Sequence, residues 1–257
     1  MKTLYRTLIL LGIGIFALAM SLLIENTVNA TRADAVKERA ISLFPHAEAE
    51  EMTISRDFQQ LYAENPDIVG WLQAGESIEY PVVQSDNSYY LTHNFFRESD
   101  SNGALFLNAD NVLIPRDNML LIHGHNMKSG AMFGTLCQYE SYEYLREHPI
   151  ITFRTIYDDE NVYYTPVFAF HASMDASNPE YFHITRFVFD TEEAEAFFSE
   201  ISALSVWDAK TDVNADDSLL TLITCSYQQE DGRFMLVCRR LRENETASEI
   251  KVCYNES

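Results

Sequence analysis

The sequence has few basic residues for its length. Its 257 residues include 18 lysines and arginines against 39 aspartates and glutamates, which gives a formal charge of -21. Nucleic-acid phosphates require clustered lysine and arginine side chains, so this composition argues against a nucleic-acid-binding protein. The same balance disfavours adsorption to an anionic membrane surface. Beyond these exclusions, an acidic balance indicates only a solvated surface.

Charged residues are absent between Thr7 and Ile24, directly after Lys2 and Arg6. An uncharged, mostly apolar segment of this length is near the lower limit for crossing a bilayer, and the preceding basic residues mark its cytoplasmic end. Val28-Asn29-Ala30 is compatible with a cleavage site, so a secreted mature form is the alternative to an uncleaved anchor. We favour the anchor, which predicts a single-pass protein of the cell membrane with an extracellular domain.

Short apolar segments separated by polar turns fill most of the chain after residue 67. With 47% hydrophobic and 12% aromatic residues, the chain can build a sizeable core. Many short strands favour a closed barrel or sandwich over a βαβ protein. In the last strand Phe234, Leu236 and Cys238 alternate with Met235 and Val237, so both faces are apolar and the strand is expected to be central. The strands are predicted at 68–72, 78–83, 103–107, 119–123, 150–157, 162–172, 219–225 and 233–241.

Helices are predicted at three places. Apolar residues recur at helical spacing over 31–44 and again over 54–62, which indicates two amphipathic helices before the first strand. A third helix is predicted between the sixth and seventh strands. There Asp190 and Glu193 form a capping-box pattern ahead of a stripe of apolar residues.

The last two strands are predicted to form a hairpin that pairs a thiol with a guanidinium. A polar segment ending in Asp231-Gly232 separates them, and a loop over 226–232 places Cys225 opposite Arg233. Directly opposed side chains lie about 5 Å apart at Cβ. A fixed cation beside a cysteine either favours the thiolate or binds an oxyanion. A buried core cysteine beside a surface arginine is the alternative.

Two motifs resemble those of a known enzyme family. Thr221-Leu222-Ile223-Thr224-Cys225 resembles the Thr-Leu-x-Thr-Cys signature of the sortases, and an arginine begins the next strand. Gly124-His125-Asn126-Met127 is similar to the family's catalytic histidine motif, and the resemblance runs from about Asn65 to Arg242. The chain resembles a class B sortase, a cysteine transpeptidase of Gram-positive bacteria. This implies a mainly β fold, an eight-stranded sortase-type barrel with N-terminal helices and a helix in the sixth connection.

The histidine pair has a second interpretation. In a His-x-His pattern at a strand end, alternation puts both imidazoles on one side, as in some zinc sites. No second pair of ligands stands at a useful spacing, so we expect no metal and no cofactor. The resemblance selects His125, whereas His123 stands where the family often has tyrosine. Asn108, where an aspartate is frequent, and Ile223, where a small residue is common, are further departures that affect the groove's preference.

The resemblance implies a thioester mechanism. Cys225 would attack a backbone carbonyl of a bound peptide, His125 would protonate the leaving amine, and Arg233 would hold the substrate or its oxyanion. The implied partners are surface proteins or pilins with a C-terminal sorting motif, and an amine of a cell wall precursor or a lysine as acceptor. A cysteine hydrolase using the same site and a non-catalytic surface binding module remain open alternatives.

The predicted organisation has four parts. An anchor or signal segment occupies 1–30, a helical extension 31–66, the catalytic barrel 67–243 and a polar, poorly ordered tail 244–257. In the predicted hairpin Cys238 pairs with Leu220 and faces away from Cys225, so these two cysteines do not bridge. A disulfide among Cys137, Cys238 and Cys253 stays open, and we favour free thiols, with Cys137 and Cys238 buried.

Overall fold

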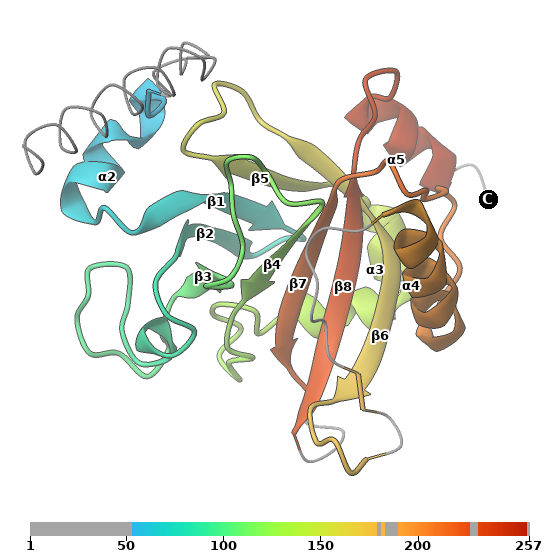
Figure 1. Ribbon diagram of the computed structural model, residues 1–257, viewed down its shortest axis with the longest axis horizontal. Helices are drawn as coiled ribbons and strands as arrows, with labels where there is room; N and C mark the ends of the chain where they lie inside the picture. Colours follow the sequence, from blue (N-terminus) through green and yellow to red (C-terminus); the bar gives the residue numbers. More distant parts are fainter. Residues whose placement is uncertain (1–52, 179–180, 183–189, 227–230, 256–257) are drawn as a thin grey trace, which may run out of the picture. The chain divides into compact units, whose positions relative to one another are not determined.

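Within the part of the chain that the structure describes, eight strands close into a β-barrel (Figure 1). The computed structural model describes residues 53–178, 181–182, 190–226 and 231–255. Around the barrel the order is β1-β2-β3-β4-β7-β8-β6-β5, and β5 pairs with β1 to complete the ring. The predicted eight-stranded barrel is therefore confirmed. The strands are β1 (Ile68–Ala74), β2 (Ile78–Val83), β3 (Leu105–Leu107), β4 (Met119–His123), β5 (Ile151–Thr155), β6 (Tyr163–Ser173), β7 (Leu219–Cys225) and β8 (Gly232–Arg240).

Two neighbouring pairs in the barrel are parallel, namely β2 with β3 and β4 with β7. Figure 1 shows the arrows of β4 and β7 side by side and pointing the same way. Parallel strands carry their carboxyl ends to the same edge of a sheet. The last residues of these two strands, His123 and Cys225, therefore lie at one edge of the barrel although they are far apart in the sequence.

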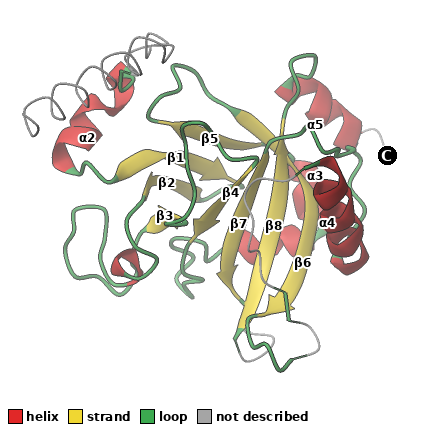
Figure 2. Cartoon of the chain, in the orientation of Figure 1, coloured by secondary structure: helices red, strands yellow, loops and turns green. Residues whose placement is uncertain are grey.

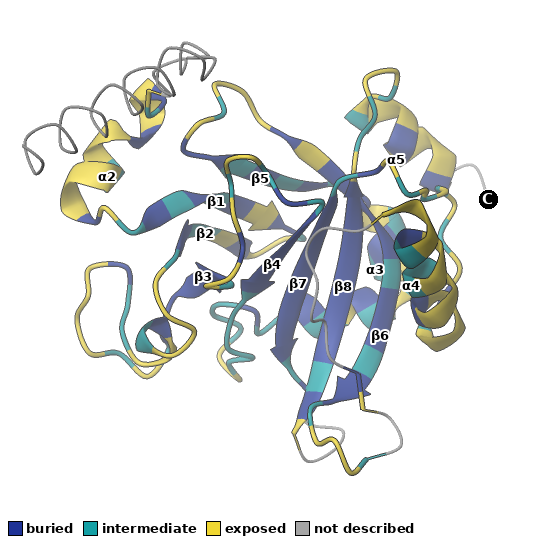
Figure 3. Ribbon diagram, viewed as in Figure 1, coloured by how far each residue is buried: buried dark blue, intermediate teal, exposed yellow. Residues whose placement is uncertain are grey.

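β8 lies between β7 and β6 and is apolar on both faces. Phe234 and Leu236 pack in the barrel interior, whereas Met235 and Val237 belong to a second cluster that includes residues of α4 (Thr191–Leu204). The prediction that this strand is central is confirmed. Figure 3 shows β7 and β8 buried along most of their length, as expected for strands covered on both sides.

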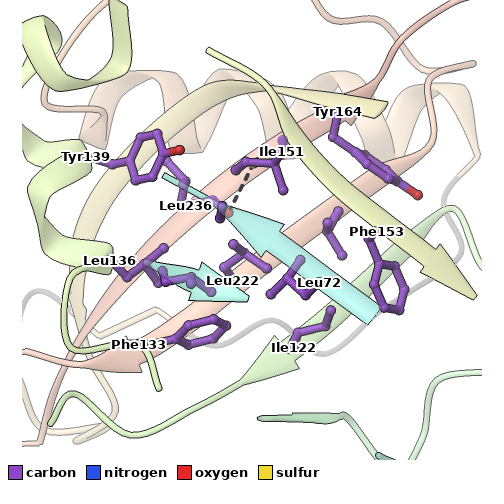
Figure 4. Packing of buried hydrophobic residues seen from close by; sticks show 14 of the residues in the cluster. Leu72, Ile122, Phe133, Leu136, Tyr139, Ile151, Phe153, Tyr164, Leu222 and Leu236 are labelled. Carbon is purple, nitrogen blue, oxygen red and sulfur yellow. Dashed lines mark hydrogen bonds between the residues drawn. The ribbon is translucent and has the colours of Figure 1, made fainter. Parts of the chain in front are cut away.

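The barrel interior fixes the relative positions of the strands. Figure 4 shows Leu72, Ile122, Leu222 and Leu236, from four different strands, packed together there. All four side chains are fully buried. Truncating one buried leucine to alanine typically costs about 2–5 kcal/mol, so each contributes substantially to holding the barrel closed.

Short helices accompany the barrel (Figure 2). The predicted helix between β6 and β7 is confirmed as α4, which packs on β6 through the stacked rings of Phe168 and Phe198. At its start the Asp190 carboxylate accepts the Glu193 backbone N–H at 2.9 Å, and the Glu193 carboxylate accepts the Asp190 N–H at 3.4 Å. The other helices are η1 (Arg56–Phe58), α2 (Gln59–Glu64), η2 (Tyr89–Leu91), η3 (Leu136–Glu140), α3 (Tyr142–Glu147) and α5 (Ala247–Asn255).

The N-terminal predictions fall only partly within the described residues. The helix predicted over 54–62 corresponds to the 3-10 turn η1 followed by α2. The segment at 1–30 and the helix predicted over 31–44 lie outside the described residues. None of the helices in the described ranges has the length and apolar character needed to cross a bilayer.

The C-terminal segment differs from its prediction as a poorly ordered tail. Residues Ala247–Asn255 form α5, and Ile250 and Tyr254 are buried in the same cluster as the barrel interior. Their spacing of four residues places both on one helix face. The fully buried Arg239 of β8 donates two hydrogen bonds of 2.6 Å to the Glu245 carboxylate, which fixes the chain just before α5. The helix is thus held by packing and by a partly buried ion pair, neither of which the polar composition of the segment indicates.

Candidate active site

The hairpin of β7 and β8 places a cysteine opposite an arginine. The antiparallel register pairs Thr224 with Phe234 and Cys225 with Arg233, so the predicted register is confirmed. Both side chains are partly buried, and one guanidinium nitrogen of Arg233 donates to the Gly232 carbonyl at 2.9 Å. The hairpin register therefore places the two residues directly opposite each other at the end of the barrel sheet.

The segment after β4 brings a histidine to the same edge of the barrel. Gly124 donates its N–H to the Ile223 carbonyl at 3.1 Å, and the buried Thr224 hydroxyl donates to the Gly124 carbonyl at 2.8 Å. His125 follows directly, and its Nε2 lies 2.8 Å from the Leu91 carbonyl. A carbonyl accepts only from a protonated nitrogen, so this contact orients the ring with hydrogen on Nε2.

Glycine is required at position 124 by the close packing around it. A Cβ there would lie 2.3 Å from Leu105 Cδ2 and 2.8 Å from Phe133 Cδ2. Contacts this short force the backbone or its neighbours to move. The absence of a side chain lets the segment that carries His125 lie directly against the barrel.

Asn126 ties the histidine segment to the cysteine. Its side-chain amide donates to the Cys225 carbonyl at 2.8 Å and lies 3.7 Å from the Cys137 sulfur. The backbone N–H of Phe133 donates to the His125 carbonyl at 2.9 Å and closes the loop behind it. The carbonyl groups of His125 and Cys225 are therefore each fixed by a hydrogen bond, the first from Phe133 and the second from Asn126.

A pocket of about 390 Å³ opens at this edge of the barrel. Its size lies within the range typical of ligand sites. The three residues that the sequence predicted as a site, His125, Cys225 and Arg233, all line it. The other lining residues are Asn87, Leu91, Phe106, Asn108, Leu121, His123, Gly124, Met174, Ile223, Thr224 and Met235.

His123 lines the same pocket in an uncharged form. Its ring stacks on Phe106 with centroids 5.2 Å apart, and its Nε2 lies 3.3 Å from the Asn108 side-chain nitrogen. Burial, with a smaller contribution from the Arg233 charge, lowers the pKa of His123 to about 4. His123 is therefore neutral at physiological pH, and its Nε2 accepts from the Asn108 amide.

The lowered pKa of His123 predicts a pH-dependent stability. Between its unfolded pKa of 6.5 and its folded pKa of about 4, the unfolded chain binds a proton that the folded chain excludes. Stability should therefore fall by roughly 1 kcal/mol between about pH 7 and about pH 5.5. Urea unfolding of the full chain in detergent at the two pH values measures this, and His123→Gln should lose clearly less. An equal loss in both proteins would contradict the assignment.

The cysteines and possible metal ligands complete the description of the site. All four cysteines are free, and burial raises the pKa of Cys137 to about 11 and that of Cys238 well above its ordinary value. Cys238 is fully buried opposite Leu220, Cys137 is only partly buried, and Cys253 is exposed on α5. Within the described ranges, no group of three or more histidine, cysteine or acidic side chains is arranged to hold a metal ion.

Known proteins share both the sequence and the fold. The sortase B of Listeria monocytogenes is 30% identical to the chain over 239 residues, which cover 90% of this chain and 93% of that protein. The chain belongs to the class B sortases. It is therefore a sortase-type cysteine transpeptidase.

Solved sortase B structures agree with this assignment. That of Bacillus anthracis sortase B is 26% identical with a TM-score of 0.67, covering 76% of this chain and 87% of that chain. A Staphylococcus aureus sortase B–substrate complex has a TM-score of 0.66 and covers 86% of this sortase and 100% of that chain. At 23% identity, the second likeness shows the fold alone. No family model matches this sortase.

Several contacts of this sortase's site were not predicted from its sequence. The Leu91 carbonyl that orients His125 comes from η2, and the Asn126 amide reaches Cys225 across 99 positions. Asn126 stands inside the histidine motif, which was the available signal, but a motif does not specify a partner. The Asn108 contact with His123 likewise joins two segments whose spacing gives no indication of contact.

Proposed function

We propose that this class B sortase is a membrane-anchored transpeptidase that cleaves a C-terminal sorting motif of surface proteins and forms a thioester at Cys225. The observation that carries the proposal is the convergence of Cys225, His125 and Arg233 on one pocket, from three segments of the barrel. A nucleophile, a proton donor and a fixed cation are the groups that acyl transfer through a cysteine requires.

The first step is attack of the Cys225 thiolate on the carbonyl carbon of the scissile peptide bond. The new C–S bond gives a tetrahedral oxyanion, and its collapse breaks the C–N bond. His125 supplies the proton to the leaving amine, so an amine and an acyl-enzyme thioester result. An incoming amine then attacks the thioester and passes a proton to His125, which the first step left neutral, so a new amide forms and the sulfur leaves as thiolate.

Arg233 is the cross-strand partner of Cys225 in the hairpin, and both residues line the pocket. A guanidinium presents several N–H donors in a fixed plane, and it stays charged at any physiological pH. Donors aimed at the developing oxyanion lower its free energy relative to the neutral carbonyl. Arg233 therefore serves to stabilise the oxyanion or to hold the peptide carbonyl before attack.

The partners follow from the same chemistry. The donor substrates are surface proteins or pilins with a sorting motif of the Asn-Pro-x-Thr or Leu-Pro-x-Thr kind, of which class B membership favours the first. The acceptor is an amine of a cell wall precursor or a lysine. Support comes from the sequence relatives in Listeria monocytogenes and Staphylococcus aureus, both of which are named sortase B. The uncharged segment from Thr7 to Ile24 supports a single-pass anchor that leaves the barrel outside the cell.

Trapping the acyl-enzyme tests the proposed function. The full chain in detergent is incubated with an Asn-Pro-x-Thr peptide, and intact-mass spectrometry should show an adduct equal to the acyl fragment. Cys225→Ala should give none, whereas Cys253→Ala, which removes the exposed thiol on α5, should behave as wild type. An adduct on another cysteine would refute the site.

The fate of the adduct separates the transpeptidase from a hydrolase. Addition of a glycine peptide, diaminopimelate or a lysine-bearing peptide should discharge the thioester to a new amide faster than water does. Discharge by water alone would move the assignment to a cysteine hydrolase with the same site. Absence of any adduct across a broad peptide panel would overturn the proposal.

A further inference from the structure

Behind Cys225, on the side away from the pocket, lies a hydrogen-bonded network of three polar side chains. Nδ1 of His171 lies 3.0 Å from the Ser226 hydroxyl, and Nε2 of His171 lies 3.2 Å from a Glu140 carboxylate oxygen. Glu140 belongs to η3, His171 to β6, and Ser226 follows the last residue of β7. The network therefore connects three segments that are distant in sequence.

The network lies on the face of the strands that points to the barrel interior. Successive side chains of a strand point to opposite faces, so Ser226 faces away from Cys225. His171 pairs with Phe234 across β6 and β8, and its ring lies 5.1 Å from that of Phe234, which belongs to the interior cluster. Ser226 is only 6% exposed. Its hydroxyl is thus out of reach of a peptide in the pocket, and it does not act as a second nucleophile.

The network helps to fix the peptide unit between Cys225 and Ser226. The Cys225 carbonyl accepts from Asn126 at 2.8 Å, and the Ser226 N–H donates to the Gly232 carbonyl at 2.8 Å. These bonds fix the Cys225–Ser226 peptide unit to the histidine loop and to β8. The contact between His171 and the Ser226 hydroxyl is a third restraint on the same backbone. β7 ends at Cys225, where a strand otherwise frays most readily.

We propose that His171 is a positioning residue for the nucleophile: through Ser226 it fixes the end of β7 and thereby the direction of the Cys225 side chain. The inference rests on the proposed function, in which Cys225 is acylated. Acyl transfer is sensitive to misplacement of the attacking atom by less than 1 Å or so, so a hold on the adjacent residue affects the chemical step. Glu140 keeps the imidazole in place by accepting from Nε2.

Two amide substitutions separate the two contacts of His171. The asparagine amide reaches the position of Nδ1 and can keep the contact with Ser226, whereas the glutamine amide reaches the position of Nε2 and can keep the contact with Glu140. His171→Gln should lower the acylation rate constant by about tenfold, the value of one lost hydrogen bond, with KM changed less than about twofold. His171→Asn should remain close to wild type.

Ser226→Ala provides an independent route to the same loss. It removes the hydroxyl that His171 holds, so it should reproduce the roughly tenfold decrease, and combining it with His171→Gln should add little more. The rate of Cys225 alkylation by iodoacetamide should stay unchanged in all variants, because that reaction does not require the peptide-aligned geometry. Additive losses in the double variant would overturn the proposed route through Ser226.

A matched control comes from another histidine–glutamate pair. His148, the residue that ends α3, lies 3.8 Å from Glu76 and is partly buried, and it has no contact with the β7 end among those described. His148→Gln should leave the acylation rate constant unchanged, and a decrease there would contradict a specific role for His171. Thermal unfolding of every variant, followed by circular dichroism, confirms that the compared proteins are folded.

The outcomes separate this inference from the proposed function. If wild type forms no adduct on Cys225, the proposed function itself fails. If wild type is acylated and His171→Gln is acylated at the same rate, only the positioning role fails. Equal losses in His171→Asn and His171→Gln would show that the ring merely packs against Phe234, and would also overturn the inference.

Discussion

Replacing His125 by alanine is expected to lower transpeptidation by about 100-fold or more, the usual contribution of a general acid placed at a leaving group. The scissile peptide nitrogen carries a single hydrogen and needs a second proton to leave as a neutral amine, so without a donor the tetrahedral species returns to substrate. His125 lines the pocket with Cys225, and its ring is oriented by the Leu91 carbonyl at 2.8 Å. Liquid chromatography of the amide product, at saturating peptide and acceptor amine, measures the loss.

His123 provides the matched control for this experiment because it is two residues away and lines the same pocket. Its pKa of about 4 leaves the imidazole neutral, so at physiological pH His123 is not the imidazolium that a general acid requires. His123→Tyr should therefore retain measurable activity, since a tyrosine can still stack on Phe106 and donate to a neighbour. The reverse outcome, with His123→Tyr inactive and His125→Ala active, would exchange the two roles.

Arg233→Lys is expected to reduce turnover by about 100-fold while leaving the protein folded. The substitution keeps the positive charge opposite Cys225 but replaces a planar fork of donors with a single ammonium on a flexible stem. A charge alone would preserve electrostatic attraction, so the loss measures the geometric part of oxyanion binding. Single-turnover acylation by rapid-quench mass spectrometry isolates the affected step.

Arg240→Lys is the control for Arg233→Lys. Arg240 is the last residue of the same strand, is exposed, and lies at the opposite end from the pocket. The Arg240→Lys substitution should leave turnover unchanged. Turnover near wild type in folded Arg233→Lys would remove Arg233 from the chemistry and leave Cys225 and His125 as the reacting pair.

The strands could be predicted because the barrel is built from local patterns. In β8 the alternation of apolar residues on both faces indicated a central strand, and the residues do divide between the interior and the outer cluster. The polar segment between Cys225 and Arg233 fixed the register of the hairpin, because a loop of given length permits few pairings. Both features depend only on residues close together in sequence.

The missed elements depend on packing that short segments do not reveal. η3 and α3 are short and rich in tyrosine, and Tyr139 is fully buried even though its hydroxyl accepts from the Gly75 N–H. α5 has only two buried apolar residues, and the longer segment 244–257 is mostly polar, so its composition favoured a poorly ordered tail. The buried side chain of Arg239 anchors the segment that precedes α5. In the sequence Arg239 cannot be distinguished from its neighbours Arg240 and Arg242.

The candidate site residues could be named from motifs, but the residues that hold them in place could not. Asn126 reaches Cys225, and His171 reaches Ser226, over separations of 99 and 55 positions. A hydrogen bond between distant segments leaves no periodic trace in the sequence, because it depends on how the barrel closes. The chemistry is therefore visible in local sequence, whereas the precision of its alignment arises only from the tertiary fold.

The parallel pairing of β4 with β7 has a consequence for when the protein becomes active during folding. Cys225 and Arg233 meet through a hairpin, which forms early because its loop is short. His125 joins them only when β4 docks on β7, a contact that closes a loop of about a hundred residues and is intrinsically slow. An incompletely folded chain thus holds a thiol and a cation but no proton donor. In the proposed mechanism such a chain cannot protonate the leaving amine, so transpeptidation begins only once the barrel has closed.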